Sequence, residues 1–319
     1  MSTNTQSSSL LIIGGTKAGK SHYGGQLLRR LQSRKGELKM SGTPSDLTPF
    51  QEVLEKLALG RSAVHTPSGT YKESIWNVRS EDGALESQLV WPDYAGEQIE
   101  NVVKLRKVTE TWVQRIRESN GWLFFVRLST INAPEDVLER PRVLDSMQVG
   151  LNAPTADVSA NAEASSGKAP DGRPDQSDTA SLRRVTLSTQ AGLVELLQAL
   201  LFIKQVGTNL QLRCPALVIA LSCYDEIAAA KDEHWEYPAD LLRTHLPLLS
   251  QYVESTWARG FVEVVGLSAL GKPLSEDFGD DVFMEAGPER QGWCIKSDGT
   301  QTGDLTLPVS LLMHMTRSA

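Results

Sequence analysis

The feature that most constrains this chain is a glycine-rich loop that follows a short apolar run near the N-terminus. Residues 10–13 are Leu-Leu-Ile-Ile, and residues 14–21 are Gly-Gly-Thr-Lys-Ala-Gly-Lys-Ser, which matches G-x-x-x-x-G-K-[ST]. A strand, this loop and a helix form a cradle of backbone N–H groups, and the helix N-terminus adds positive potential. The pattern therefore predicts a site for the phosphates of a nucleoside triphosphate with Mg²⁺, and the intact Gly-Lys-Ser ending argues against a chance turn.

Two side chains of this loop have specific expected roles. Lys20 is expected to reach the β- and γ-phosphates and to stabilise the charge that develops on them during transfer. The Ser21 hydroxyl is expected to be a ligand of the Mg²⁺ ion. The nucleotide-binding residues predicted in the loop and at the start of the helix are Gly14, Gly15, Thr16, Lys17, Ala18, Gly19, Lys20, Ser21 and His22.

Beyond the loop, strand-like apolar runs alternate with longer helical patterns, which is typical of an α/β fold with a mainly parallel sheet. The turn residues 81–83 join two of these runs into a predicted β-hairpin. The six runs are residues 10–13, 74–78, 87–91, 122–126, 216–221 and 261–265.

Three longer segments show helical patterns. Residues 193–206 are apolar almost all round and predict a buried helix. Residues 241–257 predict a helix with a kink at Pro247. Residues 99–119 predict an amphipathic helix whose outward charges include Lys104, Lys107 and Arg115.

The chain is expected to be a single domain over residues 1–319, interrupted by one segment of different composition. Residues 145–180 are rich in Ala, Ser, Asp, Pro and Gly, and such a composition buries too little apolar area to offset its ordering entropy. This segment is therefore expected to be a disordered insertion. Residues 276–319 are expected to be a C-terminal extension packed on the domain, with a short strand at 293–295 and a closing helix at 307–313.

Composition limits the classes of partner. The chain has 319 residues, 40% of them hydrophobic, which is enough for a sizeable core. No apolar run approaches the roughly 20 residues of a membrane span, and the polar start lacks the basic region of a signal peptide, so the cytoplasm is the expected location. A net charge of −7 argues against a broad nucleic-acid-binding face. The three widely spaced cysteines are expected to be free thiols.

A second segment carries a nucleotide-sensing pattern. The apolar run 87–91 leads to Asp93, and Gly96 follows three residues later. At the end of that strand, Asp93 would hold Mg²⁺ through a water, and the Gly96 N–H would donate to the γ-phosphate. An ordinary turn is the alternative, but the position after a phosphate loop and a hairpin favours the sensing role.

The polar stretch 41–71 is expected to contain a threonine that closes over the Mg²⁺ ion in the triphosphate state. Thr70 is the first choice, and Thr66 competes with it. Trp91 is expected to pack the hairpin, with a nucleotide-dependent docking face formed with Tyr94 as the alternative.

Two later strand ends suggest recognition of the base. Ser222 and Asp225 follow the run 216–221, and a carboxylate there can accept two hydrogen bonds from guanine that adenine does not offer. A backbone N–H at the end of the next run would meet the guanine carbonyl. The residues of that segment are Ser268, Ala269 and Leu270.

With these four segments in order, the chain resembles the Ras-like P-loop GTPases over about residues 8–140 and 183–275. The resemblance implies a three-layer α/β sandwich around a six-stranded, mainly parallel sheet with one antiparallel strand, and a C-terminal extension beyond it. It implies GTP and GDP as ligands, Mg²⁺ as cofactor and a molecular switch that hydrolyses GTP.

Within that group the chain is most similar to the bacterial double-GTPase family, whose members occur as adjacent pairs in predicted conflict systems. This implies a second GTPase or an effector as partner. The finer resemblance rests on Asp-x-Ala-Gly-Glu at 93–97, Ser-x-x-Asp at 222–225, and the tail residues 287–288, 291–293 and 304–308.

Two departures from the group's pattern affect the expected chemistry. The usual base segment is Asn/Thr-Lys-x-Asp, whereas this chain has Ser222 and Cys223, so selection of guanine depends mainly on Asp225. Many small GTPases have a water-orienting Gln directly after the switch glycine, whereas this chain has Glu97 followed by Gln98. A carboxylate near the γ-phosphate predicts slow hydrolysis unless Glu97 itself, Gln98 or a residue of a partner orients the attacking water. The other interpretation is that Glu97 is a solvated acidic residue at the start of a helix.

The sequence thus predicts a GTPase that is slow without a partner. Two alternatives remain at this point. One is a nucleotide-locked interaction module with little turnover, which Glu97 favours. The other is a P-loop kinase or ATPase. A kinase should have an arginine-rich lid over its acceptor site, and this sequence shows none.

Overall fold

The computed structural model describes residues 8–33, 36–63, 72–93, 99, 102–103, 105–130, 189–207, 209–229 and 237–319. These residues belong to one compact unit. The expected insertion at 145–180 lies outside them. Within the described part of the chain, no helix combines the length and apolar character needed to cross a membrane.

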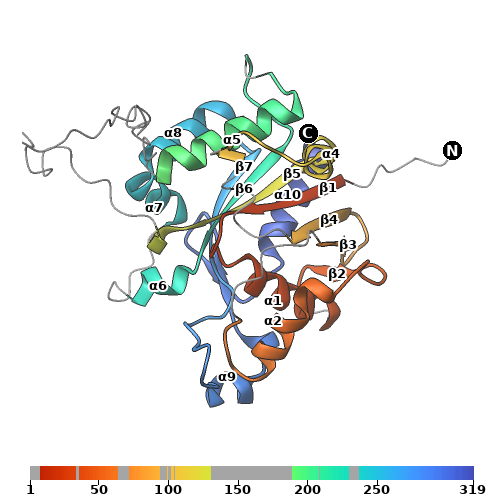
Figure 1. Ribbon diagram of the computed structural model, residues 1–319, viewed down its shortest axis with the longest axis vertical. Helices are drawn as coiled ribbons and strands as arrows, with labels where there is room; N and C mark the ends of the chain where they lie inside the picture. Colours follow the sequence, from red (N-terminus) through yellow and green to blue (C-terminus); the bar gives the residue numbers. More distant parts are fainter. Residues whose placement is uncertain are drawn as a thin grey trace, which may run out of the picture. The chain divides into compact units, whose positions relative to one another are not determined.

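A large mixed sheet forms the middle of this unit (Figure 1). Its strand order is β2-β3-β4-β1-β5-β6-β7-β8-β9. Strands β4, β1, β5, β6 and β7 run parallel to one another, whereas β3 pairs antiparallel with β4 and β2, and β8 pairs antiparallel with β7 and β9. The strands are β1 (Ser8–Gly14), β2 (Leu38–Met40), β3 (Lys72–Ser80), β4 (Glu86–Asp93), β5 (Gly121–Arg127), β6 (Ala216–Ser222), β7 (Val262–Ser268), β8 (Trp293–Ile295) and β9 (Gln301–Thr302).

The expected sheet of six strands is wrong, because the described residues form nine. All six runs chosen from the sequence are strands, and they are adjacent in the order β3-β4-β1-β5-β6-β7. The additional strands extend the sheet at its two edges, with β2 beside β3, and β8 and β9 beyond β7. One of them, β8, is the short strand expected at residues 293–295, so that prediction is confirmed. Strands β2 and β9 have three and two residues, which is too short for the alternation by which strands are recognised in a sequence.

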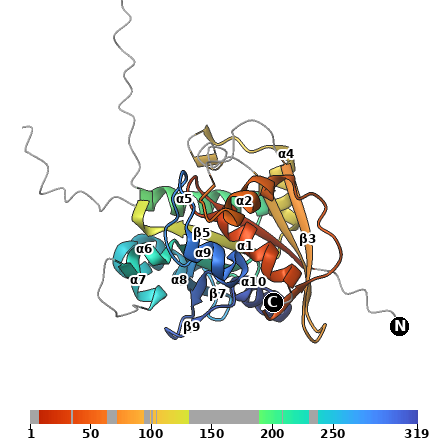
Figure 2. The same ribbon diagram turned by 90° about the horizontal axis from the view of Figure 1, so that it is seen from below.

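Helices cover both faces of the sheet, so the expected three-layer arrangement is present (Figures 1 and 2). Helices α1 and α10 pack with the side chains of Leu10 and Ile12, whereas α4, α5, α7 and α8 pack with those of Leu11 and Ile13 on the opposite face. The alternation arises because successive side chains of a strand point to opposite faces. The helices are α1 (Lys20–Ser33), α2 (Thr48–Ala58), α4 (Glu110–Glu118), α5 (Thr189–Lys204), α6 (Tyr224–Ala229), α7 (Pro238–His245), α8 (Pro247–Thr256), α9 (Asp281–Ala286) and α10 (Leu307–Ser318), with 3₁₀ turns at Leu128–Thr130 and Pro288–Arg290.

The helix expected over residues 99–119 is interrupted. Arg106 has a φ of +54°, and α4 begins only at Glu110, where the Thr109 side chain accepts a hydrogen bond from the Trp112 N–H. A positive φ is incompatible with a right-handed helix, so the hydrophobic pattern continues across a break in the backbone.

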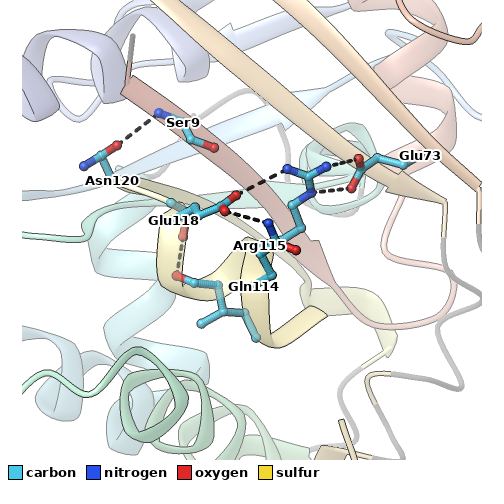
Figure 3. A network of polar contacts seen from close by, with 8 residues as sticks. Ser9, Glu73, Gln114, Arg115, Glu118 and Asn120 are labelled. Carbon is cyan, nitrogen blue, oxygen red and sulfur yellow. Dashed lines mark hydrogen bonds and ion pairs between the residues drawn. The ribbon is translucent and has the colours of Figure 1, made fainter. Parts of the chain in front are cut away.

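Arg115 is also not simply turned outward (Figure 3). Its guanidinium donates from Nε (2.8 Å) and Nη2 (2.5 Å) to the two carboxylate oxygens of Glu73. This bidentate pair joins α4 to β3. Only 24% of the Arg115 side chain and 15% of the Glu73 side chain are exposed.

The other two helix predictions also need correction. The segment 241–257 is not one kinked helix but two helices, α7 and α8, which separate at Leu246 because Pro247 lacks the N–H that a continuous helix requires. Most of the segment 193–206 lies in α5, which ends at Lys204. This helix is buried along one side only, and Phe202 is 84% exposed.

A group of aromatic rings packs the hairpin of β3 and β4 against α1 and α2. The rings of Trp76 and Trp91 stack with centroids 5.3 Å apart, and Phe50 lies 5.0 Å from Trp76 and 5.2 Å from Trp91. Trp91 is only 4% exposed, so the packing role is confirmed for it. Tyr94 lies outside the described residues.

Gly24 lets α1 approach these rings. A Cβ at Gly24 would lie 2.3 Å from Cε1 of Phe50 and 2.7 Å from Cζ2 of Trp91. Such distances require the buried rings to move, and a packed core resists that movement.

We therefore expect Gly24→Ala to destabilise the protein by about 1–3 kcal/mol, although alanine is the better helix former. Gly192→Ala in α5 is the matched control, because nothing lies within 4 Å of a Cβ there. The control should gain up to about 1 kcal/mol. Urea unfolding followed by circular dichroism measures both, and equal effects of the two substitutions would contradict the packing argument.

Candidate functional site

The glycine-rich loop joins the end of the central strand β1 to the start of α1, as the sequence predicts. The loop turns through two residues with positive φ, Lys17 (+60°) and Gly19 (+77°). A Cβ at Gly14 would lie 2.8 Å from the Cβ of Phe125, so this glycine allows β1 to pack closely on β5. At Gly15, by contrast, nothing lies within 4 Å of a Cβ. A loop with this open backbone before a helix N-terminus suits an anion.

The ammonium group of Lys20 lies against the loop itself. Its Nζ donates to the carbonyl oxygens of Gly14 and Gly15, both at 2.7 Å. Lys20 and Ser21 are both partly buried at the first turn of α1. The lysine charge is therefore next to the backbone that would surround a phosphate.

The segment expected to read the base contacts this loop. A Cβ at Gly19 would lie 3.5 Å from Sγ of Cys223 and 3.7 Å from Cβ of Ser222. The Ser222 hydroxyl is buried beside the loop and has no hydrogen-bond partner within the described residues. The two segments are about two hundred residues apart in the sequence, and the pairing of β1, β5 and β6 brings them together.

Asp225 lies in the first turn of α6 and links two strand ends. Its carboxylate is hydrogen-bonded to the Ser268 side chain at the end of β7. Burial raises the pKa of Asp225, and the hydrogen bond from Ser268 partly offsets this effect. The Ser268 hydroxyl also accepts from the Gly271 N–H at 2.9 Å, which orders the turn that contains Ala269 and Leu270.

Arg127 is a charged residue of this region that the sequence analysis did not single out. It ends β5, and its Nη1 donates to the Lys17 carbonyl of the loop at 3.2 Å. The same guanidinium pairs with both carboxylate oxygens of Glu226 in α6. A charged residue ending a buried parallel strand was the signal that could have identified it.

His22 connects the start of α1 to the segment expected to contain the switch threonine. The N–H of Ala63 donates to its Nε2 at 3.0 Å, so this nitrogen is unprotonated. Burial, assisted by the charge of Arg127, lowers the pKa of His22 to about 4. The geometry gives His22 a structural contact with residue 63, and the expected nucleotide contact stays a prediction.

Several expected site residues lie outside the described residues. These residues are Thr66, Thr70, Gly96, Glu97 and Gln98. Asp93 is placed by its backbone, at the end of β4. The parallel pairing of β1 and β4 runs from Ser8–Ser87 to Leu11–Val90, so Gly14 and Asp93 end their strands at the same end of the sheet.

The oxygen groups at this end of the sheet suit Mg²⁺, which needs few protein ligands, rather than a metal ion whose ligands all come from the protein. Within the described part of the chain, no group of three His, Cys, Asp or Glu side chains could hold a metal ion. Mg²⁺ needs no such group, because it usually takes one or two protein oxygens together with phosphates and waters. The Ser21 hydroxyl, at the first turn of α1, is such an oxygen.

The fold and the loop define a P-loop nucleotide-binding domain of the GTPase type. Residues 11–312 match the model of the family described as Double-GTPase 1. The match covers nearly the whole chain, so the protein belongs to this family and the resemblance expected from the sequence is confirmed. Family membership makes it a GTP-binding domain.

Two solved structures are similar to this chain at low identity. One is the GTPase-like domain of S. cerevisiae Ski7, solved with GDP and inorganic phosphate, at 15% identity and a TM-score of 0.36, covering 82% of this chain and 43% of that one. The other is Methanosarcina barkeri Roco2 RocCORdC bound to GDP, at 12% identity and a TM-score of 0.27, covering 88% of this chain and 47% of that one. The chain therefore spans less than half the length of either structure. No curated protein matches it.

The environment of Asp225 gives a pH prediction. If Asp225 binds guanine as the sequence predicts, only its ionised carboxylate can accept the two hydrogen bonds, and burial raises the pKa of this group above its usual value of 3.8. At pH values where Asp225 is protonated in the nucleotide-free protein, guanine binding must release that proton. The affinity for GDP should therefore fall as the pH drops through the raised pKa of Asp225.

Titration calorimetry with GDP from pH 7 downward measures this dependence. The matched control is ADP, which does not use the carboxylate in this way, so its binding should not show the same acid limb. If GDP and ADP affinities change in parallel, the carboxylate is not the titrating group.

Proposed function

We propose that this protein is a GTP-binding switch that hydrolyses GTP to GDP and phosphate with Mg²⁺. One observation carries the proposal. The glycine-rich loop lies against Ser222 and Cys223, so the expected phosphate and base segments meet at one end of the sheet. Asp225 and Ser268 are hydrogen-bonded at that same end. A nucleotide is the ligand that carries both phosphates and a base.

In the proposed site the loop amides and Lys20 bind the phosphates. Lys20 would leave the carbonyls of Gly14 and Gly15 for the β- and γ-phosphate oxygens, which offer it full negative charge. Mg²⁺, when bound, neutralises phosphate charge, and we propose Ser21, Thr70 and Asp93 as the residues that hold it, with Asp93 acting through a water. The Gly96 N–H would donate to the γ-phosphate.

The base end of the site accounts for selection of guanine. Asp225 would accept hydrogen bonds from the ring N–H and the exocyclic amino group, and the turn after Ser268 would offer a backbone N–H to the guanine carbonyl. Adenine leaves these groups unpaired, which costs a few kcal/mol. The buried hydroxyl of Ser222 lies where a bound nucleotide would pass from base to phosphate.

We further propose that hydrolysis is slow in the isolated chain and that a second GTPase, encoded beside it in a bacterial conflict system, accelerates it. The support is Glu97, which stands where a water-orienting glutamine is common. The same residue favours a second candidate function, an interaction module that holds GTP with little turnover.

Removal of the Lys20 charge tests the phosphate site. Lys20→Ala should abolish measurable GTP binding without unfolding the protein, because its ammonium group contacts loop carbonyls and not the core. Lys39→Ala is the matched control. Among the described residues Lys39 pairs with the exposed Glu81, and the variant should bind GTP normally. Calorimetry on both folded variants measures the affinity for GTP, and equal affinity in the two would exclude the proposed site.

The wild-type protein should bind GTP more tightly than ATP by several orders of magnitude.

Single-turnover hydrolysis separates the roles of Glu97 and Gln98. We expect the isolated wild type to turn over at about 10⁻⁴ to 10⁻² s⁻¹, as unassisted switches do. Glu97→Gln should raise the rate if the carboxylate only repels the γ-phosphate, and should lower the rate or leave it unchanged if Glu97 orients the water. A fall confined to Gln98→Ala would assign the role to Gln98. Fast hydrolysis by the isolated wild type would contradict the need for a partner, and GTP bound without any turnover would support the locked module.

A further inference from the structure

The contact between the phosphate loop and the base segment lacks a cation at the position where related proteins carry a lysine. Cys223 occupies that position with a φ of +52°, next to Gly19 of the loop. Burial raises the pKa of its thiol to about 12, so this side chain is neutral. Residue 223 therefore supplies no charge to hold the two segments together.

Arg127 supplies a positive charge at this contact from a different strand. Its Nη1 donates to the Lys17 carbonyl in the loop at 3.2 Å, and its Nε donates to Oε2 of Glu226 at 3.2 Å. Its Nη2 donates to the other oxygen of Glu226, and Ser129 donates to that carboxylate as well. One guanidinium thus contacts the loop and the helix that carries the base-reading carboxylate.

We propose that Arg127 is the positioning residue that joins the phosphate loop to the base segment, in place of a lysine at residue 223. The proposal rests on the proposed function, because it assigns Arg127 a part in binding GTP and GDP. A planar guanidinium suits the task, since it presents several N–H groups in fixed directions and can engage two partners at once.

The two contacts fix opposite ends of the site. Holding the Lys17 carbonyl limits the orientations of the neighbouring loop amides, which would bind phosphate. Holding Glu226 fixes the first turn of α6, where Asp225 is the adjacent residue. Arg127 therefore sets the distance between the phosphate donors and the guanine acceptor before the nucleotide arrives, and such preorganisation increases affinity.

Arg127 can be replaced without unfolding the protein. Its side chain is 26% exposed and that of Glu226 is 25% exposed, and partly exposed ion pairs contribute little to stability. A loss of nucleotide affinity in an Arg127 variant therefore reports on the site and not on the fold.

The test uses Arg127→Met, which keeps the length of the side chain and removes its charge and donors. We expect its affinity for GDP and GTP to fall about 10- to 100-fold, as loss of a charge-assisted hydrogen bond does. Affinity for ATP should fall less, because adenine does not use Asp225, so the preference for GTP over ATP should narrow. Kd values from calorimetry and Tm values from thermal melting give these quantities.

Arg115→Met is the matched control. It removes another arginine that pairs with both oxygens of a glutamate, Glu73, between α4 and β3. It should leave the affinity for GTP, GDP and ATP unchanged. If Arg127→Met has a lowered Tm, Glu226→Gln takes its place. This second variant keeps the guanidinium of Arg127 and weakens only the attachment of Arg127 to α6.

Rescue by a lysine at residue 223 separates positioning from a general structural role. Arg127→Met combined with Cys223→Lys should regain most of the lost affinity and the preference for guanine. Equal affinities in Arg127→Met and Arg115→Met, or a loss that is equal for GTP and ATP and is not rescued, would overturn the proposal. Failure of the wild type to bind GTP or GDP would instead overturn the proposed function.

Discussion

The close packing of β1 between two parallel neighbours is the constraint on which the rest of the site depends. Residues 10–13 are at most 1% exposed, so this strand is buried on both faces. Its last residue, Gly14, can pack beside Phe125 before the loop begins only because it has no side chain that would clash with Phe125. The register of the sheet then brings the ends of β4, β5 and β6 to the same place. The phosphate loop follows β1, and the segments expected to bind the metal and the base follow β4, β6 and β7, so strand pairing brings these segments together.

Charge at this end of the sheet is distributed over several elements. Lys20 comes from α1, Arg127 from β5, and Asp225 and Glu226 from α6. The carboxylate of Asp225 is satisfied by Ser268, and that of Glu226 by Arg127 and Ser129. The two neighbouring acids therefore have separate hydrogen-bond partners. In our proposal, Arg127 of β5 compensates for the missing lysine at Cys223 from outside the base-reading motif.

The sequence predicted the features that depend on local patterns. The loop, the hairpin and the six main strands follow from hydrophobic runs and turn residues that are adjacent in the chain, and the structure has all of them. The break at Arg106 was not predictable, because a positive φ at a residue other than glycine is imposed by its surroundings. The Arg115–Glu73 and Arg127–Glu226 pairs join residues 42 and 99 positions apart. Such contacts depend on the three-dimensional arrangement, which one sequence without relatives does not specify.

The C-terminal residues have a consequence for how this domain can be divided. Tyr23, in the helix that begins at the phosphate loop, donates its hydroxyl to the Leu305 carbonyl, and Arg30 of the same helix donates to the Gln291 carbonyl. Leu312 and Met313 of α10 belong to the same hydrophobic cluster as Tyr23. Cutting the chain after β7 would therefore uncover the inner side of the loop's own helix. The support of this helix therefore lies well past the last segment that a nucleotide is expected to touch, and a growing chain must extend beyond residue 313 before the helix is fully covered.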